Sequence, residues 1–188
     1  MESYYARDEL EKMGLKKLGQ NVKISRRAAI YSMHTIEIGD NVRIDDFVFL
    51  SGGKGIKIGD YVHIASYSAL YGKNGIQIGD YVNISGRVSI YSTSDDYSGE
   101  FMTGPLVEQQ YIHDIGEKIV IEDHVIIGTG SVLLPGAILH TGVAVGAMSL
   151  VKKELKSFHI YAGIPVRCVK RRSKEMLRNI LGRENGTP

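Results

Sequence analysis

Two adjacent aspartates and a set of scattered histidines are the side chains in this sequence best suited to moving a proton. Asp95 and Asp96 lie in the stretch STSDDYSG, and His113 is followed directly by Asp114. His63 lies further upstream, in the segment YVHIAS. An imidazole beside a carboxylate can act as a general base, because the carboxylate orients the ring and favours its protonated form. These residues indicate proton-transfer chemistry, provided that the fold brings them together.

They are set in a chain that repeats itself every 20 residues. The segments LGQNV, IGDNV, IGDYV and IGDYV begin at positions 18, 38, 58 and 78. A shorter period of six lies inside this repeat, and the first slot of every hexad is Ile, Leu or Val. These slots are Leu18, Ile24, Ile30, Ile38, Ile44, Leu50, Ile58, Ile64, Leu70, Ile78, Ile84, Ile90, Ile121, Ile127, Leu133, Leu139, Val145 and Val151.

A six-residue period does not match the 3.6 residues of an α-helical turn, so it does not predict helices. It predicts a parallel β-helix of triangular section, in which each hexad is a short strand and a turn. The aliphatic slots then stack inward, and coil upon coil buries one continuous core. The expected fold class is therefore an all-β solenoid of about six triangular coils.

Each 20-residue coil exceeds three hexads by two residues, and this surplus falls in the third hexad. The segments YSMHTIE, SGGKGIK and YGKNGIQ predict a bulged corner there. In the fourth coil the same hexad opens into a long insertion, residues 92–118, which holds six acidic residues and, from Ser92 to Glu117, no Lys or Arg. A loop of this length without structure of its own is usually functional. We expect it to project from one edge and to reach a neighbouring subunit.

The chain divides into three parts. Residues 1–17 form an N-terminal helical segment with a short amphipathic helix from Tyr4 to Met13. Residues 18–156 form the β-helix with its projecting loop, and residues 157–188 form a basic C-terminal segment and helix. Ser173 is expected to cap this last helix. The apolar side of the helix would carry Met176, Leu177, Ile180 and Leu181.

Composition narrows the function classes. The 188 residues fit one domain, no apolar run is long enough for a membrane span, and the N-terminus lacks an apolar signal core. The single Cys168 excludes an intrachain disulfide and favours a reducing compartment, so we expect a cytoplasmic protein. From Lys152 onward there are ten Lys or Arg and three Asp or Glu, which favours an anionic ligand. Nucleic acid is not favoured, because the net charge is only +2 and the basic segment lacks interleaved aromatics.

The hexads, the loop in the lower-middle coil and the segments IIGTGSVLLPG, VGAMSLVKK and YAGIPVRCVK resemble those of the hexapeptide-repeat acetyltransferases. The resemblance covers nearly the whole chain and is greatest to the sugar O-acetyltransferases, such as the maltose, galactoside and surface-polysaccharide enzymes. It implies a left-handed β-helix, although parallel crossovers are normally right-handed. It further implies a homotrimer that binds acetyl-CoA as co-substrate in a groove between two subunits, and no metal.

The resemblance also implies which residues contact the coenzyme. The implied positions are Thr129, Ala147, Lys152 or Lys153, and, after the Gly-x-Pro turn, Arg167 and Lys170. Coenzyme A carries a pyrophosphate and a 3′-phosphate, and Lys and Arg are natural partners for both. The alternative is that Thr129 and Ala147 only fill a turn and that the basic segment is a solvated surface.

At the catalytic position this sequence departs from the family. The sugar O-acetyltransferases carry a histidine base early in the loop, where this chain has Asp95, and an asparagine that falls here on Ala65. One hypothesis is that His63 acts as base with Asp95 or Asp96 of the next subunit. A second assigns the base to His113. In a third, neither histidine acts, which would fit an amine acceptor that needs less help.

The function expected from this pattern is transfer of an acetyl group from acetyl-CoA to a sugar hydroxyl, in the synthesis of a surface polysaccharide. One alternative is N-acetylation of a nucleotide-linked amino sugar. The acidic residues Asp95, Asp96 and Glu100 argue against this alternative through repulsion of a diphosphate. A non-catalytic structural β-helix is another alternative. A zinc enzyme of the carbonic anhydrase type is less favoured, because the histidines are scattered.

Overall fold

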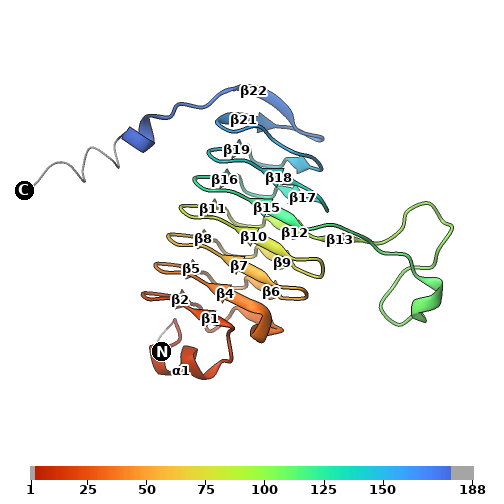
Figure 1. The fold of residues 1–188 in the computed structure, drawn as a ribbon, viewed down its shortest axis with the longest axis horizontal. Helices are drawn as coiled ribbons and strands as arrows, with labels where there is room; N and C mark the ends of the chain where they lie inside the picture. Colours follow the sequence, from red (N-terminus) through yellow and green to blue (C-terminus); the bar gives the residue numbers. More distant parts are fainter. Residues whose placement is uncertain (1–2, 179–188) are drawn as a thin grey trace, which may run out of the picture.

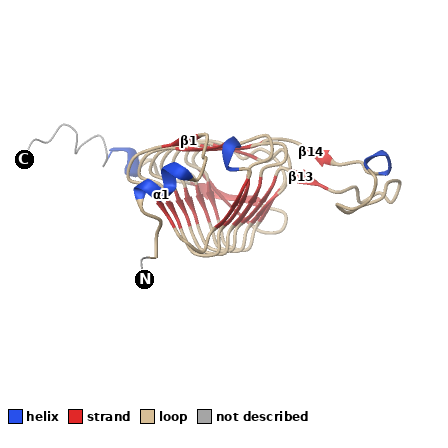
Figure 2. Cartoon of the chain, turned by 90° about the horizontal axis from the view of Figure 1, so that it is seen from below, coloured by secondary structure: helices blue, strands red, loops and turns tan. Residues whose placement is uncertain are grey.

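Three parallel sheets form the walls of a triangular prism in the computed structural model, which describes residues 3–178 (Figures 1 and 2). Wall 1 consists of β1 (Lys17–Leu18), β4 (Ile36–Ile38), β7 (Ile56–Ile58), β10 (Ile76–Ile78), β15 (Ile119–Ile121) and β18 (Ile138–Leu139). Wall 2 consists of β2 (Lys23–Ile24), β5 (Arg43–Ile44), β8 (His63–Ile64), β11 (Asn83–Ile84), β16 (Ile126–Ile127), β19 (Ala144–Val145), β21 (His159–Ala162) and β22 (Arg167–Arg171). Wall 3 consists of β3 (Ala29–Tyr31), β6 (Phe49–Ser51), β9 (Ala69–Tyr71), β12 (Ser89–Tyr91), β17 (Val132–Leu133) and β20 (Leu150–Val151).

The chain turns from wall 1 to wall 2 at corner 1–2, from wall 2 to wall 3 at corner 2–3, and from wall 3 back to wall 1 at corner 3–1. Neighbouring strands before the loop pair residues that lie 20 apart, so that His63 faces Arg43 on one side and Asn83 on the other. The 20-residue repeat is therefore one coil. Six coils are complete, and β21 begins a seventh before β22 folds back antiparallel on it.

The aliphatic slots fill the inside of the prism as the period predicts. All of them are buried except Leu18, which is partly buried at the open lower end. Helix α1 (Arg7–Lys12) covers that end and places Leu10 in the core with 1 % of its surface exposed. The helix is shorter than the expected span from Tyr4 to Met13. Stacked coils bury apolar surface that no coil could bury alone.

The C-terminal helix begins as the sequence indicates. Glu175 donates its backbone N–H to Ser173 Oγ at 3.2 Å, and residues 175–178 are helical. Ile180 and Leu181, predicted on its apolar side, lie outside the described residues. No helix within residues 3–178 is long and apolar enough to cross a membrane.

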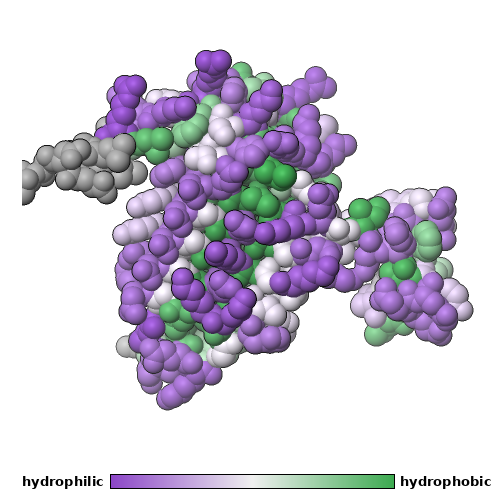
Figure 3. Space-filling model, in the orientation of Figure 1, coloured by the Kyte–Doolittle hydropathy of each residue, from purple (hydrophilic) through white to green (hydrophobic). Residues whose placement is uncertain are grey.

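The insertion at 92–118 leaves corner 3–1 and stands away from the prism as a separate arm (Figures 1 and 2). We expected this insertion to lack secondary structure, but it contains two strands and a short helical turn. Strands β13 (Thr93–Ser94) and β14 (Ile115–Gly116) pair antiparallel at its root, and a short 3₁₀ turn, η2 (Gln109–Tyr111), lies near its tip. The arm mixes polar and apolar side chains on its surface (Figure 3).

The bulged corner of the coil below anchors this root. Asn74 donates its side-chain amide to Thr93 Oγ1 at 2.6 Å, and its backbone N–H to Ser92 Oγ at 2.9 Å. Lys73 forms an ion pair with Asp114, on the returning side of the loop. The first coil fills the same bulge with a 3₁₀ turn, η1 (Met33–Thr35). The Gly- and Asn-containing hexads thus mark the place where the chain leaves and re-enters the prism.

Candidate functional site

Small side chains line corner 2–3 over three successive coils. Ser85 is half-buried directly after β11, and its hydroxyl has no hydrogen-bond partner among the described residues. Thr129, one coil further, donates its hydroxyl to the carbonyl of Gly86 at 2.6 Å. At Gly128 an added Cβ would lie only 2.5 Å from the backbone nitrogen of Ala147. Gly128 is therefore required by the close approach of the next coil, and the small side chains keep the outer surface of this corner low.

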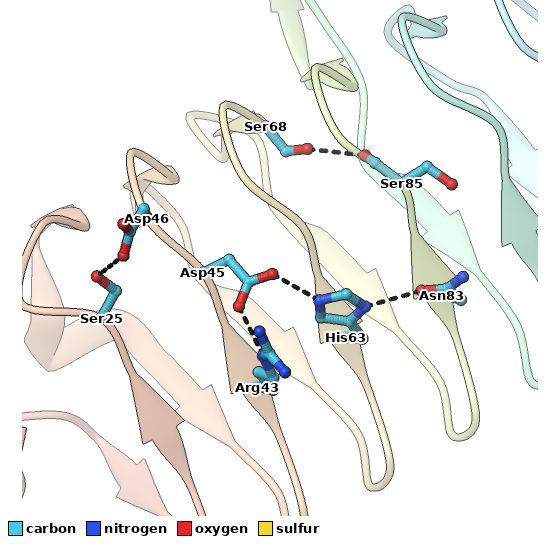
Figure 4. Close-up of polar contacts among 8 residues, drawn as sticks. All are labelled: Ser25, Arg43, Asp45, Asp46, His63, Ser68, Asn83 and Ser85. Carbon is cyan, nitrogen blue, oxygen red and sulfur yellow. Dashed lines mark hydrogen bonds and ion pairs between the residues drawn. The ribbon is translucent and has the colours of Figure 1, made fainter. Parts of the chain in front are cut away.

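A row of polar side chains lies on wall 2 and its corner, from the coil of Ser85 to two coils below it (Figure 4). His63 Nε2 lies 2.8 Å from Asp45 Oδ2, and His63 Nδ1 lies 3.1 Å from Asn83 Oδ1. The other oxygen of Asp45 accepts a hydrogen bond from Arg43 Nε at 2.6 Å. Burial acts to raise the pKa of Asp45, but the hydrogen bonds from His63 and Arg43 outweigh it and lower the pKa.

This row weighs against His63 as the general base. Both of its ring nitrogens are engaged within the chain, so neither lone pair is free to take a proton from an acceptor. The alternation of the strand predicted that His63 faces outward, but it could not show that Asp45 reaches it from the coil below. We now expect His63 to hold the wall together.

A hollow of about 750 Å³ lies at corner 3–1, between the root of the arm and wall 3. Asp95 borders it together with Lys73, Tyr91, Tyr97 and Leu134. The carboxylate of Asp95 is exposed and has no hydrogen bond or ion pair within residues 3–178. It is therefore available to a ligand that enters the hollow.

Asp96 is differently placed. Its carboxylate accepts hydrogen bonds from the hydroxyl of Ser98 at 2.6 Å and from the backbone N–H of Ser98 at 3.1 Å. The Ser98 hydroxyl is the main cause that lowers the pKa of Asp96. Asp96 thus closes its own turn, and of the two aspartates Asp95 is the one with chemistry to offer.

The predicted site residues separate into two groups on the prism. Thr129 and Ala147 lie at corner 2–3 with Ser85, which was not predicted, whereas Asp95, Lys152 and Lys153 lie at or near corner 3–1. The width of wall 3 lies between these two groups within one chain. Arg167 and Lys170 lie on β22, where Arg167 pairs with Ala162 above corner 2–3. All six predicted coenzyme contacts are exposed or border the exposed face.

Three of the remaining histidines, His113, His124 and His140, have neighbours that explain them. His113 is exposed and its ring packs against Phe101, with the ring centroids 5.0 Å apart. His124 stacks on Tyr81 at 5.1 Å. Within residues 3–178, no group of three or more His, Cys, Asp or Glu side chains is arranged to hold a metal ion.

His140 joins two coils near the predicted coenzyme lysines. Its Nε2 lies 2.6 Å from Glu154 Oε1 and its Nδ1 lies 2.7 Å from Glu122 Oε1. The hydrogen bond to Glu154, followed by that to Glu122, raises the pKa of His140 above its ordinary value of 6.5. For Glu122, burial raises the pKa, but the hydrogen bonds from His140 and Thr141 prevail and lower it below 4.5. The clasp fixes the turn that carries Lys152 and Lys153.

The clasp makes stability depend on pH in a defined direction. The contribution of His140 is complete below pH 6.5 and is lost as pH rises through its raised folded pKa. The contribution of Glu122 is complete above pH 4.5 and is lost as pH falls through its lowered pKa.

We expect His140→Gln to lower the melting temperature by on the order of 2 °C near pH 5.5 and by less near pH 9. Thermal unfolding of both proteins across this range checks it, and a difference that grows with pH would contradict it.

Comparisons with known proteins fit this geometry. No family model matches the chain. It is 48 % identical over 176 residues to the dTDP-4-amino-4,6-dideoxy-D-glucose acyltransferase of Escherichia coli, covering 93 % of this chain and 92 % of that protein. It also matches AntD, an N-acyltransferase from Bacillus cereus solved with dTDP and 3-hydroxybutyryl-CoA. That match has a TM-score of 0.93 and 44 % identity over 99 % of this chain and all of the other.

An AntD variant in complex with dTDP and coenzyme A matches with a TM-score of 0.95 and 43 % identity over the whole of both chains. The predicted left-handed parallel β-helix is confirmed by these matches. A maltose O-acetyltransferase from Clostridium difficile matches at a TM-score of 0.62 and 20 % identity, over 89 % of this chain and 75 % of that one. At that identity the likeness extends to the fold alone.

Proposed function

Because the chain belongs to the hexapeptide-repeat β-helix sugar acyltransferases, we propose that it transfers an acyl group from coenzyme A to the amine of a dTDP-linked 4-amino sugar. We expected an acyltransferase with a sugar hydroxyl as acceptor. The names of its relatives favour the alternative, N-acylation of a nucleotide-linked amino sugar. They also favour an acidic loop that accommodates the diphosphate of such an acceptor.

The pair Ser85 and Asp95 supports this proposal most directly. Solved forms of AntD include variants of an aspartate and of a serine ten positions before it, with dTDP-4-amino-4,6-dideoxyglucose or dTDP bound. In this sequence, only Ser85 is followed by an aspartate ten residues later. The side-chain polar atoms of Ser85 and Asp95 also have no partner within the described chain, so both are available to a ligand. We assign both to the acceptor and acyl end of the site.

An amine acceptor explains why the loop lacks a histidine. The reaction forms a bond between the sugar nitrogen and the thioester carbon and breaks the carbon–sulfur bond of acyl-CoA. Asp95 accepts a hydrogen bond from the amine and thereby directs the lone pair of the nitrogen at the carbonyl carbon. It then receives the proton that the nitrogen loses. That proton passes to the departing thiolate. The Ser85 hydroxyl donates to the carbonyl oxygen as negative charge develops there.

The family resemblance implies that the coenzyme lies beside Thr129 and Ala147 at corner 2–3. Its phosphates would meet Arg167 and Lys170 at the top of wall 2, where both side chains are exposed. Lys152 and Lys153 lie at the far corner of the same chain, so they would contact a coenzyme held by the next subunit. This division, like that of Ser85 and Asp95, supports a homotrimer with shared sites. Nothing in this arrangement requires a metal ion.

An acceptor screen tests the function. We expect rapid release of free thiol from acetyl-CoA or 3-hydroxybutyryl-CoA with dTDP-4-amino-4,6-dideoxyglucose, and at least about 10³-fold lower kcat/KM with maltose, which has no amine. The matched control is the same nucleotide sugar with a hydroxyl in place of the amine, which differs only at the reacting atom. Turnover that is faster with maltose or with the hydroxyl analogue would overturn the proposal.

A further inference from the structure

A ladder of four exposed side chains runs down corner 2–3, immediately outside Ser85. Arg27, Phe47, Tyr67 and Arg87 occupy the same place in four successive coils. The rings of Phe47 and Tyr67 stack with centroids 5.0 Å apart and planes 22° apart. The guanidinium of Arg27 lies 5.9 Å from the Phe47 ring, and that of Arg87 lies 5.9 Å from the Tyr67 ring. This ladder of two aromatic rings between two cations faces outward.

The backbone at these positions favours glycine, yet the chain uses large residues. Phe47, Tyr67 and Arg87 have φ values of 60°, 63° and 61°, in the left-handed region that bulky side chains rarely adopt. Gly130, which follows in the next coil at φ 70°, shows the residue that the turn itself prefers. Phe47 and Tyr67 nevertheless remain 48 % and 57 % exposed. Burial in this chain therefore does not explain them.

Stacking between coils explains only part of the arrangement. Corner 1–2 carries a similar ladder, in which Tyr61 stacks on Tyr81 at 4.8 Å and Tyr81 stacks on His124 at 5.1 Å. These three residues also have positive φ values. Among the described residues no arginine lies over its tyrosine rings, and the ladder lies at the other end of wall 2 from Ser85. The ladder at corner 1–2 therefore serves as a control, because its rings stack between coils but lie far from Ser85.

The charges along the corner 2–3 ladder are unequal. Arg27 is paired with Asp46 at 2.9 Å, so a carboxylate accompanies the lower cation. Arg87 has no carboxylate partner among the described residues, and it shares its turn with Ser85. A phosphate group is therefore favoured at the Arg87 end and repelled near Asp46. Coils lie about 4.8 Å apart, so the ladder from Arg87 to Phe47 spans about 10 Å, which suits a nucleoside diphosphate.

We propose that the ladder binds the nucleoside diphosphate half of the acceptor, an inference that rests on the proposed function. The base lies against the exposed edges of the Phe47 and Tyr67 rings, because the ring faces are covered by each other and by the two guanidinium groups. The diphosphate lies on Arg87, whose guanidinium donates in a planar fork. The sugar then reaches the level of Ser85. The ladder thereby sets the requirement for a nucleotide-linked sugar rather than a free one.

The test measures binding of dTDP by calorimetry to the intact oligomer. We expect Tyr67→Ala to raise the Kd about 10-fold. Arg87→Gln should raise it about 10-fold and weaken its dependence on salt. The matched control Tyr81→Ala removes a stacked tyrosine of the same backbone conformation at corner 1–2, and should stay within about twofold of wild type. With the amino-sugar substrate, Tyr67→Ala should raise KM for the acceptor while kcat and KM for acyl-CoA hold.

Tyr67→Leu keeps an apolar side chain without a ring, so it serves if Tyr67→Ala does not fold. Suppose that wild type acylates the dTDP-linked amino sugar while the Tyr67 and Arg87 variants bind dTDP as wild type does. The ladder proposal is then wrong and the proposed function stands. If wild type neither binds dTDP nor acylates the sugar, the proposed function fails and the ladder falls with it. An equal loss of dTDP binding in Tyr81→Ala would also overturn the ladder.

Discussion

Asp95→Ala is expected to lower kcat/KM for the dTDP-linked amino sugar by about 10²- to 10³-fold. The change removes the exposed carboxylate at the root of the arm, which has no partner in the described chain and is free to hold the amine. Affinity for coenzyme A should change by less than about twofold, because the expected coenzyme contacts lie elsewhere. Steady-state kinetics with thiol detection and calorimetry with coenzyme A measure the two quantities.

The neighbouring aspartate provides the control. Asp96→Ala removes a carboxylate of equal charge that is bonded to Ser98, so we expect a loss of no more than about threefold. His63→Ala should also keep most of the turnover, since its ring is bound between Asp45 and Asn83. If Asp96→Ala or His63→Ala is as damaging as Asp95→Ala, the assignment of Asp95 is wrong. Asp95→Asn separates charge from shape, and we expect it to resemble Asp95→Ala.

The fold could be predicted because its cause is local and repeated. An aliphatic residue at every sixth position has only one way to be buried in all coils, and the slots from Ile24 to Val151 are buried accordingly. The bulged corner was also visible, since Asn74 and its neighbouring glycines mark it. The structure of the arm was not visible. Its strands pair Thr93 with Gly116 across a long insertion, and neither strand shows the alternation that would indicate a sheet.

The site residues stay predictions. Asp95 was singled out because it aligns with the position of the loop histidine in the sugar O-acetyltransferases. Ser85 was missed, although it lies one coil above Ala65 in the same column, in the coil that opens into the loop. The signal in the sequence was that Ser85, a polar residue, occupies the position that Ala65 occupies in the coil below. The partners of His63 could not be predicted, because they depend on how far Asp45 reaches between coils.

The relatives favour the acceptor that we ranked second, and the reason for our ranking is similar. Charge summed along the loop suggested repulsion of a diphosphate, but the structure distributes that charge unevenly. Asp96 is bonded to Ser98, and Asp114 is paired with Lys73. At corner 2–3, by contrast, Arg87 has no carboxylate partner among the described residues. The local field at a site depends on which charges are already neutralised, and a sequence does not show this.

Mixing two inactive variants is expected to restore activity. Ser85 lies at corner 2–3 and Asp95 at corner 3–1 of the same chain, with wall 3 between them. If one acceptor meets both side chains, they come from two subunits. In trimers assembled at random from equal amounts of Ser85→Ala and Asp95→Ala chains, about a quarter of the interfaces then join an intact Ser85 to an intact Asp95. Co-expression should recover about a quarter of the wild-type kcat per site.

The same experiment has a built-in control. A chain that carries both substitutions, co-expressed with either single variant, produces no interface with both intact side chains, so it should stay inactive. Light scattering should give a trimer for wild type and for every mixture. If the co-expressed single variants remain as inactive as each alone while still forming trimers, both side chains do not act across the interface. The two corners would then belong to separate sites, because one prism holds them apart.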